Sequence, residues 1–149
     1  MGTRERRERS NESDRLLSSL FTGVAGVALA AVGGYGRGEL APGSDLDILF
    51  LHNGRVDDHA LGELVNKVLY PLWDKSFKVD HSVRTRAETR DAASSDLKVA
   101  LGLLDIRLIC GDADLVAAVQ HDAIDDWRGR SRERLPQLRT SLVERHLRA

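Results

Sequence analysis

The chain has 149 residues, of which 42% are hydrophobic and 30% charged, and its formal net charge is −1. This composition is that of a globular domain large enough to bury a core, and it lacks the basic excess of a general DNA-binding protein. No apolar run approaches the roughly 20 residues of a membrane helix, and the charged N-terminus is unlike a secretory signal. Because Cys110 is the only cysteine, an internal disulfide is excluded, and we expect a cytoplasmic domain with neither DNA nor membrane as partner.

The first predicted elements are a helix and a short strand. Residues 1–11 are charged and lack apolar periodicity, which predicts a frayed arm. A helix should follow, with Asn11 or Ser13 as its N-cap. Its apolar residues recur at helical spacing: Leu16, Leu17, Leu20 and Phe21. Residues 27–32 then predict a buried strand that leads into a glycine-rich turn.

A second strand and a second helix come next. Residues 46–51 are apolar and run into a turn signal, His52-Asn53-Gly54. The helix after it carries an apolar stripe: Leu61, Leu64, Val65, Val68, Leu69, Leu72 and Trp73. The stripe places Trp73 in the core, and Pro71 is expected to kink or end the helix.

The third predicted strand alternates between apolar and polar residues over 77–83. Asp80 lies on its polar face, and His81 lies on its apolar face as a packing histidine. If this strand lies beside residues 46–51, Asp80 reaches the same place as the acids that precede that strand.

The rest of the chain predicts helices. Asp96 can cap one that ends near Gly111, with an apolar stripe of Leu97, Ala100, Leu101, Leu104 and Leu108. Two more are expected at about 115–127 and 135–147. Residues 128–149 carry seven arginines against Glu133 and Glu144, a net of +5, which indicates either a solvated helical face or a surface for an acidic partner or a further domain.

These elements predict an α/β or α+β fold, in which a small mixed sheet is followed by a helical C-terminal part. We divide the chain into an N-terminal arm and helix (1–24), a core (25–95) and a helical C-terminal segment (96–149).

The candidate chemistry lies at the glycine-rich turn and the strand that follows it. Asp45 and Asp47 are spaced i, i+2 at a strand start, so their side chains share a face with alpha carbons roughly 7 Å apart. Two carboxylates at that separation can share a pair of Mg²⁺ ions. Gly33 and Gly34 let backbone N–H groups come close to phosphates. A phosphate cradle beside paired metal-binding acids is what nucleotidyl transfer requires.

Taken separately, the parts of this segment also suggest a dinucleotide fingerprint, a calcium loop or a surface turn. The dinucleotide fingerprint needs a third glycine where Glu39 stands, and a calcium loop needs a ligand where Leu49 stands. An ordinary surface turn explains residues 42–45 taken alone. The Arg37 guanidinium could contact a triphosphate or hold the loop through a salt bridge, and the Ser44 hydroxyl could cap the turn or touch phosphate.

The joint pattern is more specific than its parts. Gly33-Gly34, ten residues and Asp45-x-Asp47 before an apolar strand resemble the signature of the nucleotidyltransferase superfamily that includes DNA polymerase beta. Within it, the fuller motif from Gly33 to Asp47 resembles the PII uridylyltransferase (uridylyl-removing) family. Three later segments resemble that family in the same order: Tyr70-Pro71-Leu72-Trp73-Asp74, His81-Ser82-Val83-Arg84-Thr85 and Leu104-Asp105-Ile106-Arg107-Leu108-Ile109-Cys110-Gly111. The resemblance covers about residues 25–149.

One position departs from the family pattern. The family more often has glycine before the His-Ser-Val-Arg run, where this chain has Asp80. Related nucleotidyltransferases carry a third catalytic carboxylate at the corresponding point. Asp80 is therefore either a third acid or a substitution at a strand end.

The resemblance implies a nucleotidyltransferase fold and a specific reaction. Such an enzyme moves UMP, or alternatively AMP, from an NTP to a tyrosine hydroxyl of a PII-type signalling protein and so regulates nitrogen assimilation. Two Mg²⁺ ions, with Mn²⁺ as an alternative, would lie at the acids and the phosphates near the turn. The implied metal-binding and catalytic residues are Asp45, Asp47 and Asp80, with Asp80 as general base, and the implied nucleotide-binding residues are Gly33, Gly34, Arg37 and Ser44.

The sequence lacks the hydrolase and glutamine-sensing domains of full-length family members, so we expect a truncated member. Two other hypotheses remain open. The chain could be a nucleotide- and metal-binding module that is inactive without those domains, or a transferase of the superfamily with another acceptor.

Overall fold

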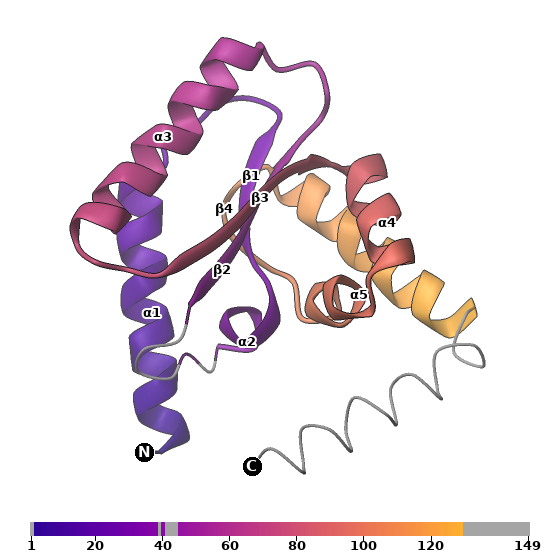
Figure 1. The fold of residues 1–149 in the computed structure, drawn as a ribbon, viewed down its shortest axis with the longest axis horizontal. Coiled ribbons are helices and arrows are strands. Elements are labelled where there is room, and N and C mark those ends of the chain that lie inside the picture. Colours follow the sequence, from indigo (N-terminus) through magenta and orange to yellow (C-terminus); the bar gives the residue numbers. More distant parts are fainter. Residues whose placement is uncertain (1, 39, 41–44, 130–149) are drawn as a thin grey trace.

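A four-stranded mixed sheet in the order β3-β2-β1-β4 forms the centre of the structure, a computed structural model that describes residues 2–38, 40 and 45–129 (Figure 1). The strands are β1 (Val27–Ala31), β2 (Leu46–His52), β3 (Val79–Thr85) and β4 (Arg107–Gly111). β1 pairs antiparallel with β2 and β4, whereas β2 pairs parallel with β3. The mixed sheet confirms the predicted fold class.

Helices cover both faces of this sheet. They are α1 (Thr3–Leu20), α2 (Gly33–Gly36), α3 (Asp58–Asp74), α4 (Arg86–Ser95), α5 (Leu97–Leu103) and a further helix over residues 113–129. Within the described part of the chain, no helix is both long and apolar enough to cross a bilayer.

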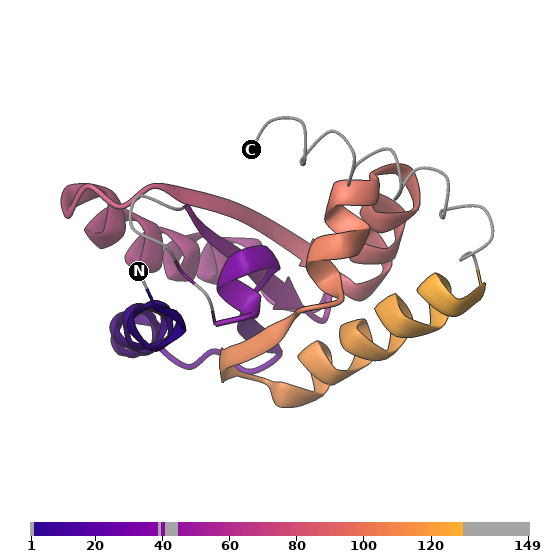
Figure 2. The same ribbon diagram turned by 90° about the horizontal axis from the view of Figure 1, so that it is seen from below.

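The core is split by the sheet into two layers, because successive strand residues point to opposite faces. One layer packs Leu29, Ile48 and Phe50 against α1 and α3, and the other packs Leu49 and Leu51 against α5 and the helix over 113–129. Figure 2 shows the two helical layers on either side of the strands. All five residues of β1 are buried, as expected for a central strand.

The helix α3 carries the chain from the end of β2 to the start of β3, so the two strands can run parallel. Asp57 caps it by accepting a hydrogen bond from the Ala60 N–H, at 3.0 Å. The predicted apolar stripe is buried up to Leu72, and the helix ends at Asp74, within one turn of Pro71.

The prediction that Trp73 lies in the core is wrong. Its side chain is 46% exposed, and it packs edge-on against Tyr70 and against His81 of β3, with ring centroids 5.6 and 6.4 Å apart. Trp73 lies in the last turn of α3. His81 is a packing histidine, but on the surface rather than in the core.

The predicted frayed arm at residues 1–11 is also wrong, because α1 begins at Thr3. The segment is joined to the rest of the fold at Ser10, which is only 2% exposed and accepts a hydrogen bond from the Leu40 N–H at 3.1 Å. Neither Asn11 nor Ser13 is an N-cap, since both lie inside the helix. A tertiary contact thus orders a segment without apolar periodicity.

A single helix from residue 97 to Gly111 is the third wrong prediction. The helix α5 begins as expected, with the Asp96 side chain accepting from the Lys98 N–H at 2.9 Å, but it ends at Leu103. Residues 107–111 instead form β4, which pairs with β1. Strand pairing in the sheet has overridden the leucine periodicity, as tertiary context often does.

The helix α4 was not predicted, although its start has a sequence signal. Thr85 and Glu88 form a capping box, in which each side chain accepts from the backbone N–H of the other, at 3.2 and 2.9 Å. The helix expected at 115–127 is confirmed. The helix expected at 135–147 and residues 130–149 of the basic segment lie outside the described residues.

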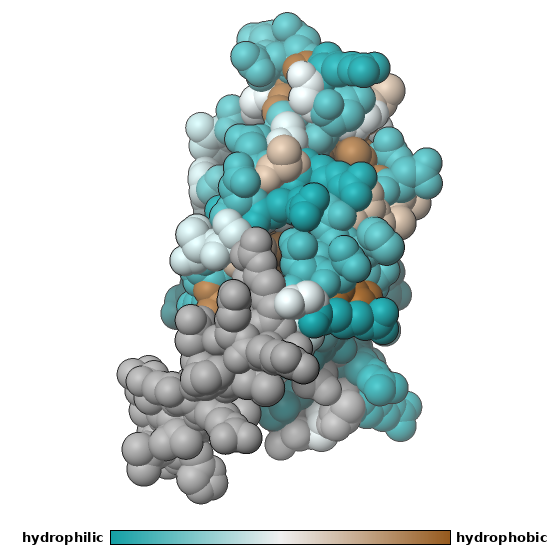
Figure 3. All heavy atoms as spheres, turned by 90° about the vertical axis from the view of Figure 1, so that its right-hand side faces the viewer, coloured by the Kyte–Doolittle hydropathy of each residue, from teal (hydrophilic) through white to brown (hydrophobic). Residues whose placement is uncertain are grey.

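Ion pairs join α4 to the helix over 113–129. Arg86 donates two hydrogen bonds to Asp122, at 2.6 and 2.8 Å, and Arg90 pairs with Asp126 at 3.3 Å. The Arg86 guanidinium lowers the pKa of the Asp122 carboxyl. Figure 3, which faces this layer, shows a mainly hydrophilic surface with scattered apolar residues. This layer therefore covers the sheet and presents a polar exterior.

A network centred on Arg107 joins three elements far apart in the sequence. The guanidinium of Arg107, on β4, forms an ion pair with Asp14 of α1 and donates to the carbonyl oxygens of Tyr35 and Gly36, at 3.0 and 3.2 Å. The Tyr35 hydroxyl donates to Asp14 at 2.6 Å, and its burial raises the pKa of Tyr35 well above the usual range. The network fixes α2 between α1 and the sheet.

We expect Asp14→Ala to lower the free energy of unfolding by about 1–3 kcal/mol, because it leaves the partly buried Arg107 side chain and the Tyr35 hydroxyl without their shared acceptor. Tyr35→Phe should cost about 1 kcal/mol, since one hydrogen bond is lost. Urea unfolding followed by circular dichroism measures both changes.

The matched control is Glu63→Gln, which breaks the exposed pair between His59 and Glu63 on α3. Exposed pairs contribute about 0–1 kcal/mol. A loss in Asp14→Ala no larger than in this control would contradict the role of the network.

Candidate active site

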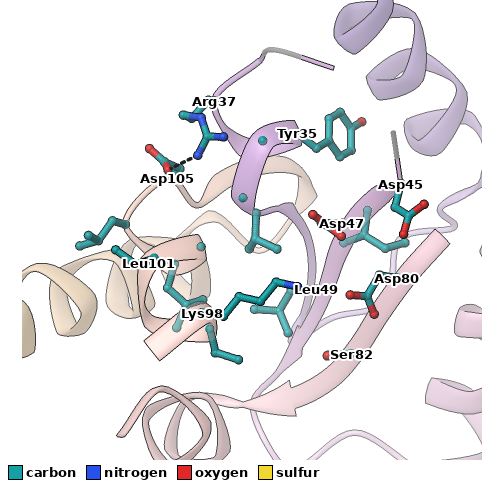
Figure 4. A pocket seen from close by; sticks show the side chains of 18 of the residues that line it. Tyr35, Arg37, Asp45, Asp47, Leu49, Asp80, Ser82, Lys98, Leu101 and Asp105 are labelled. Carbon is teal, nitrogen blue, oxygen red and sulfur yellow. Dashed lines mark hydrogen bonds and ion pairs between the residues drawn. The ribbon is translucent and has the colours of Figure 1, made fainter. Parts of the chain in front are cut away.

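An open cavity of about 870 Å³ lies on the sheet face that Asp47 shares, bordered by β2, β3, α2 and α5 (Figure 4). Charged side chains of both signs line it. The acids are Asp45, Asp47, Asp80, Asp96 and Asp105, and the cations are Arg37, Arg84 and Lys98.

The three predicted acids meet at this cavity. Asp47 and Asp80 are direct partners in the parallel register of β2 and β3, so their alpha carbons are about 4.8 Å apart and their side chains share a face. Asp45 precedes β2 by one residue and lines the same cavity. The structure therefore confirms that the strand of Asp80 lies beside the strand of Asp47.

The charges of the other two acids act on Asp47. The pKa of the Asp47 carboxyl is raised, first by its partial burial and then by the negative charges of Asp80 and Asp45, while Lys98 opposes the shift. A raised carboxyl pKa means that ionised Asp47 is less stable in the folded chain than in water. The site therefore holds negative charge that a cation would stabilise.

The donor set fits Mg²⁺ bound together with a phosphate ligand. Among the described residues, no three carboxylate, histidine or cysteine side chains stand close enough to hold a metal ion by themselves. Mg²⁺ does not need such a cage, because it is usually bound by one or two carboxylates plus substrate phosphates. Asp47 and Asp80, with Asp45 beside them, supply oxygen ligands of that kind.

The glycine turn comes close to the acids at Gly33. Gly33 has φ +59°, and a Cβ built on it would lie 3.1 Å from Asp47 Oδ2. Glycine thus keeps space open beside this carboxylate. The nearest atom to a Cβ on Gly34 would be Arg37 Nη2 at 3.5 Å, so Gly34 is not required by packing.

Of the glycines that the structure describes, Gly36 has the tightest surroundings, and the sequence did not single it out. A Cβ there would lie 2.3 Å from the backbone oxygen of Asp105 and 3.1 Å from that of Ala31. Gly36 therefore lets α2 pack closely against the segment after α5.

The other two predicted nucleotide-binding residues are Arg37 and Ser44, and the structure describes only the first. Arg37 forms an ion pair with Asp105 at 3.1 Å, which is the loop-stabilising alternative, and it also lines the cavity. Ser44 lies outside the described residues.

Sequence reasoning missed Lys98 as a site residue. It enters the cavity from α5, and its charge acts on Asp47. The Asp96 cap predicted the start of this helix, but no local signal indicates that its first turn faces β2. Only the packing of α5 on the glycine turn brings Lys98 to the site.

Comparisons with known proteins show the family of the chain. A family model described as the nucleotidyltransferase domain matches residues 14–102. A bifunctional uridylyltransferase/uridylyl-removing enzyme of Streptomyces coelicolor is 47% identical over 148 residues, which cover 97% of this chain and 18% of that protein. One of the same name from Mycobacterium tuberculosis is 45% identical over 115 residues, covering 77% of this chain and 14% of the relative.

The chain thus spans less than a fifth of the length of these curated relatives. Among solved structures, a chain from a toxin–antitoxin crystal structure with AMP-PNP overlaps 89% of this chain and 98% of its own length, with a TM-score of 0.46 and 16% identity.

We expect Asp47→Asn to raise the melting temperature at pH 7 in the presence of EDTA. The raised pKa of Asp47 means that its ionised form destabilises the folded state at every pH above that pKa. Below the ordinary carboxyl pKa of 3.8 the side chain is protonated in both states, so the difference between variant and wild type should vanish there. Thermal melts at pH values from 7 down to about 4 should show the difference in melting temperature between variant and wild type becoming smaller.

Asp91→Asn on α4, exposed and absent from the cavity lining, gives the background effect of the same exchange. The raised pKa of Asp47 would be contradicted if the difference in melting temperature between Asp47→Asn and wild type equals this background. It would also be contradicted if that difference widens as the pH falls.

Two of the three glycines of α2, Gly34 and Gly36, should differ sharply in how much stability they lose on substitution. Gly36→Ala is expected to cost about 1–3 kcal/mol, because its Cβ has no room beside the Asp105 backbone. Gly34→Ala should change stability by less than about 1 kcal/mol. Urea unfolding of both variants compares their losses in free energy of unfolding directly. Equal losses would contradict the close packing of Gly36 against the Asp105 backbone.

Proposed function

Because the chain belongs to the nucleotidyltransferase family, we propose that it transfers a nucleoside monophosphate from an NTP to an acceptor hydroxyl. The observation that carries the proposal is the pairing of Asp47 with Asp80 at a cavity that the glycine turn borders. The cavity volume lies within the roughly 300–1,000 Å³ of small-molecule sites. These features support an acid pair on one side of a bound triphosphate and a glycine turn on the other.

The reaction is a displacement at phosphorus. The acceptor hydroxyl loses its proton, its oxygen forms a bond to the α-phosphorus, and the bond from that phosphorus to the bridging oxygen of the β-phosphate breaks. Pyrophosphate leaves with the bonding electron pair. Asp80, an exposed acid, is the group we assign to accept the proton.

Each remaining residue has a role in holding the reactants. Bound Mg²⁺ would supply positive charge at the phosphates, and Asp45, Asp47 and Asp80 are the residues that would hold it. The open space beside Gly33 lets the backbone N–H groups of Gly33 and Gly34 approach the phosphates. Arg37 would add its charge at the same end of the cavity.

We further propose that the nucleotide is UMP, with AMP as the alternative, and that the acceptor is a tyrosine hydroxyl of a PII-type signalling protein in the cytoplasm. The names of the curated relatives support uridylyl transfer. β3 lies at an edge of the described sheet, which leaves Asp80 accessible to an acceptor as large as a protein.

The test is to incubate the chain with Mg²⁺, a PII protein and each labelled NTP in turn, and to locate any adduct by mass spectrometry. We expect a nucleotidyl group on a tyrosine, formed with UTP. Asp47→Asn and Asp80→Asn should each reduce the rate at least about 100-fold, because each removes several kcal/mol of transition-state stabilisation. Asp91→Asn should leave the rate unchanged.

The other outcomes separate the alternatives. Nucleotide binding by the wild type without any adduct would identify a binding module and overturn the transferase proposal. An adduct on another acceptor, or retained activity in both cavity variants, would overturn the acceptor or the site assignment respectively.

A further inference from the structure

Lys98 is held in the wall of the cavity that faces the acids. It is the second residue of α5, and its backbone N–H donates to Asp96 at 2.9 Å, which fixes the helical turn that carries it. The same helix packs on the glycine turn, since a Cβ on Gly102 would lie 3.6 Å from the Gly33 nitrogen. Figure 4 shows the Lys98 side chain extending from α5 across the cavity toward Asp47 and Asp80. The scaffold therefore sets the position of Lys98, although the residue is exposed.

The other two cations of the cavity are placed differently. Arg37 forms an ion pair with Asp105 at 3.1 Å. Arg84 follows Asp80 by four residues on β3, which puts its alpha carbon roughly 13 Å further along the strand. Of these three cations, Lys98 is the one whose positive charge acts on Asp47.

We propose that Lys98 is a shared counter-cation, which offsets the acids when the cavity is free of nucleotide and contacts the triphosphate when Mg²⁺–NTP is bound. The proposal rests on the proposed function, because it assumes that this cavity takes Mg²⁺–NTP. With Mg²⁺–NTP bound, the charge of the acids would be neutralised, and the Lys98 ammonium would be attracted to the phosphates instead. A lysine is suited to this exchange, since its compact charge sits on a flexible four-carbon stem and can move without backbone change.

This role makes two predictions of opposite sign. Without nucleotide, Lys98 competes with the metal for the acids, so Lys98→Met should strengthen Mn²⁺ binding about threefold, the effect of removing one charge several ångströms away in water. With nucleotide, the same variant loses a charge-assisted contact to phosphate, so the affinity for Mg²⁺–UTP should fall about tenfold.

The experiment measures binding only and needs no acceptor protein. Electron paramagnetic resonance measures the concentration of free Mn²⁺ in the presence of the nucleotide-free chain and so gives the affinity for Mn²⁺. Calorimetry gives the affinities for Mg²⁺–UTP, Mg²⁺–ATP and Mg²⁺–tripolyphosphate. Methionine keeps the apolar stem and the helix propensity of lysine, Lys98→Arg keeps the charge, and Lys67→Met, on the exposed side of α3, is the matched control.

We expect Lys98→Met to lose affinity equally for all three phosphate ligands while gaining affinity for Mn²⁺, and Lys98→Arg to restore both values. Unchanged Mn²⁺ binding, or a loss confined to one nucleotide, would overturn the inference, the latter because it would place Lys98 at the base. An effect of the same size in Lys67→Met would also overturn it.

The same measurements distinguish a failure of the proposed function from a failure of the role proposed for Lys98. If wild type binds Mg²⁺–UTP no better than Asp47→Asn, the cavity is not the nucleotide site, and both proposals are overturned. If wild type binds in an Asp47-dependent way and Lys98→Met binds equally well, only the role of Lys98 is lost.

Discussion

The parallel pairing of β2 with β3 is the constraint on which the site depends. A slip of one residue in this register would turn Asp80 to the opposite face and bring His81 beside Asp47. The register is set on the apolar side of β3, where Val79 and Val83 pack into the core layer of α1 and α3. The acids of the polar side are thus aligned by hydrophobic packing on the other face.

The glycine turn is held by a second, polar constraint. Arg107 hydrogen-bonds the backbone of Tyr35 and Gly36 and pairs with Asp14, so α2 is tied to α1 and β4 together. Glycine is therefore required at two positions of this turn for different structural reasons. Gly36 allows close packing against the Asp105 backbone, whereas Gly33 adopts a positive φ and leaves space beside the Asp47 carboxylate.

The sequence predicted what depends on local pattern and missed what depends on distant contacts. Alternation and periodicity located β1, β2, β3 and α3, and the i, i+2 spacing located Asp45 and Asp47. The start of α1 was missed because Ser10 is ordered by Leu40, thirty residues away. β4 was missed because Leu108 continues the helical spacing of Leu101 and Leu104 until pairing with β1 is known. Lys98 reaches the site only through the packing of α5.

The position of β3 at an edge of the described sheet has two consequences, one for strand pairing with other chains and one for access to the proposed site. A strand at the edge of a sheet exposes unpaired backbone groups that can pair with another chain, and charged side chains on such a strand oppose that pairing. β3 lies at an edge of the described sheet and carries Asp80 and Arg84, with Lys78 immediately before it. An acid at position 80 therefore opposes strand pairing at this edge of the sheet, and it is also the group that we propose meets the acceptor. Covering this edge with a further strand would remove the need for the charge, but it would also close the side from which we propose that the acceptor approaches.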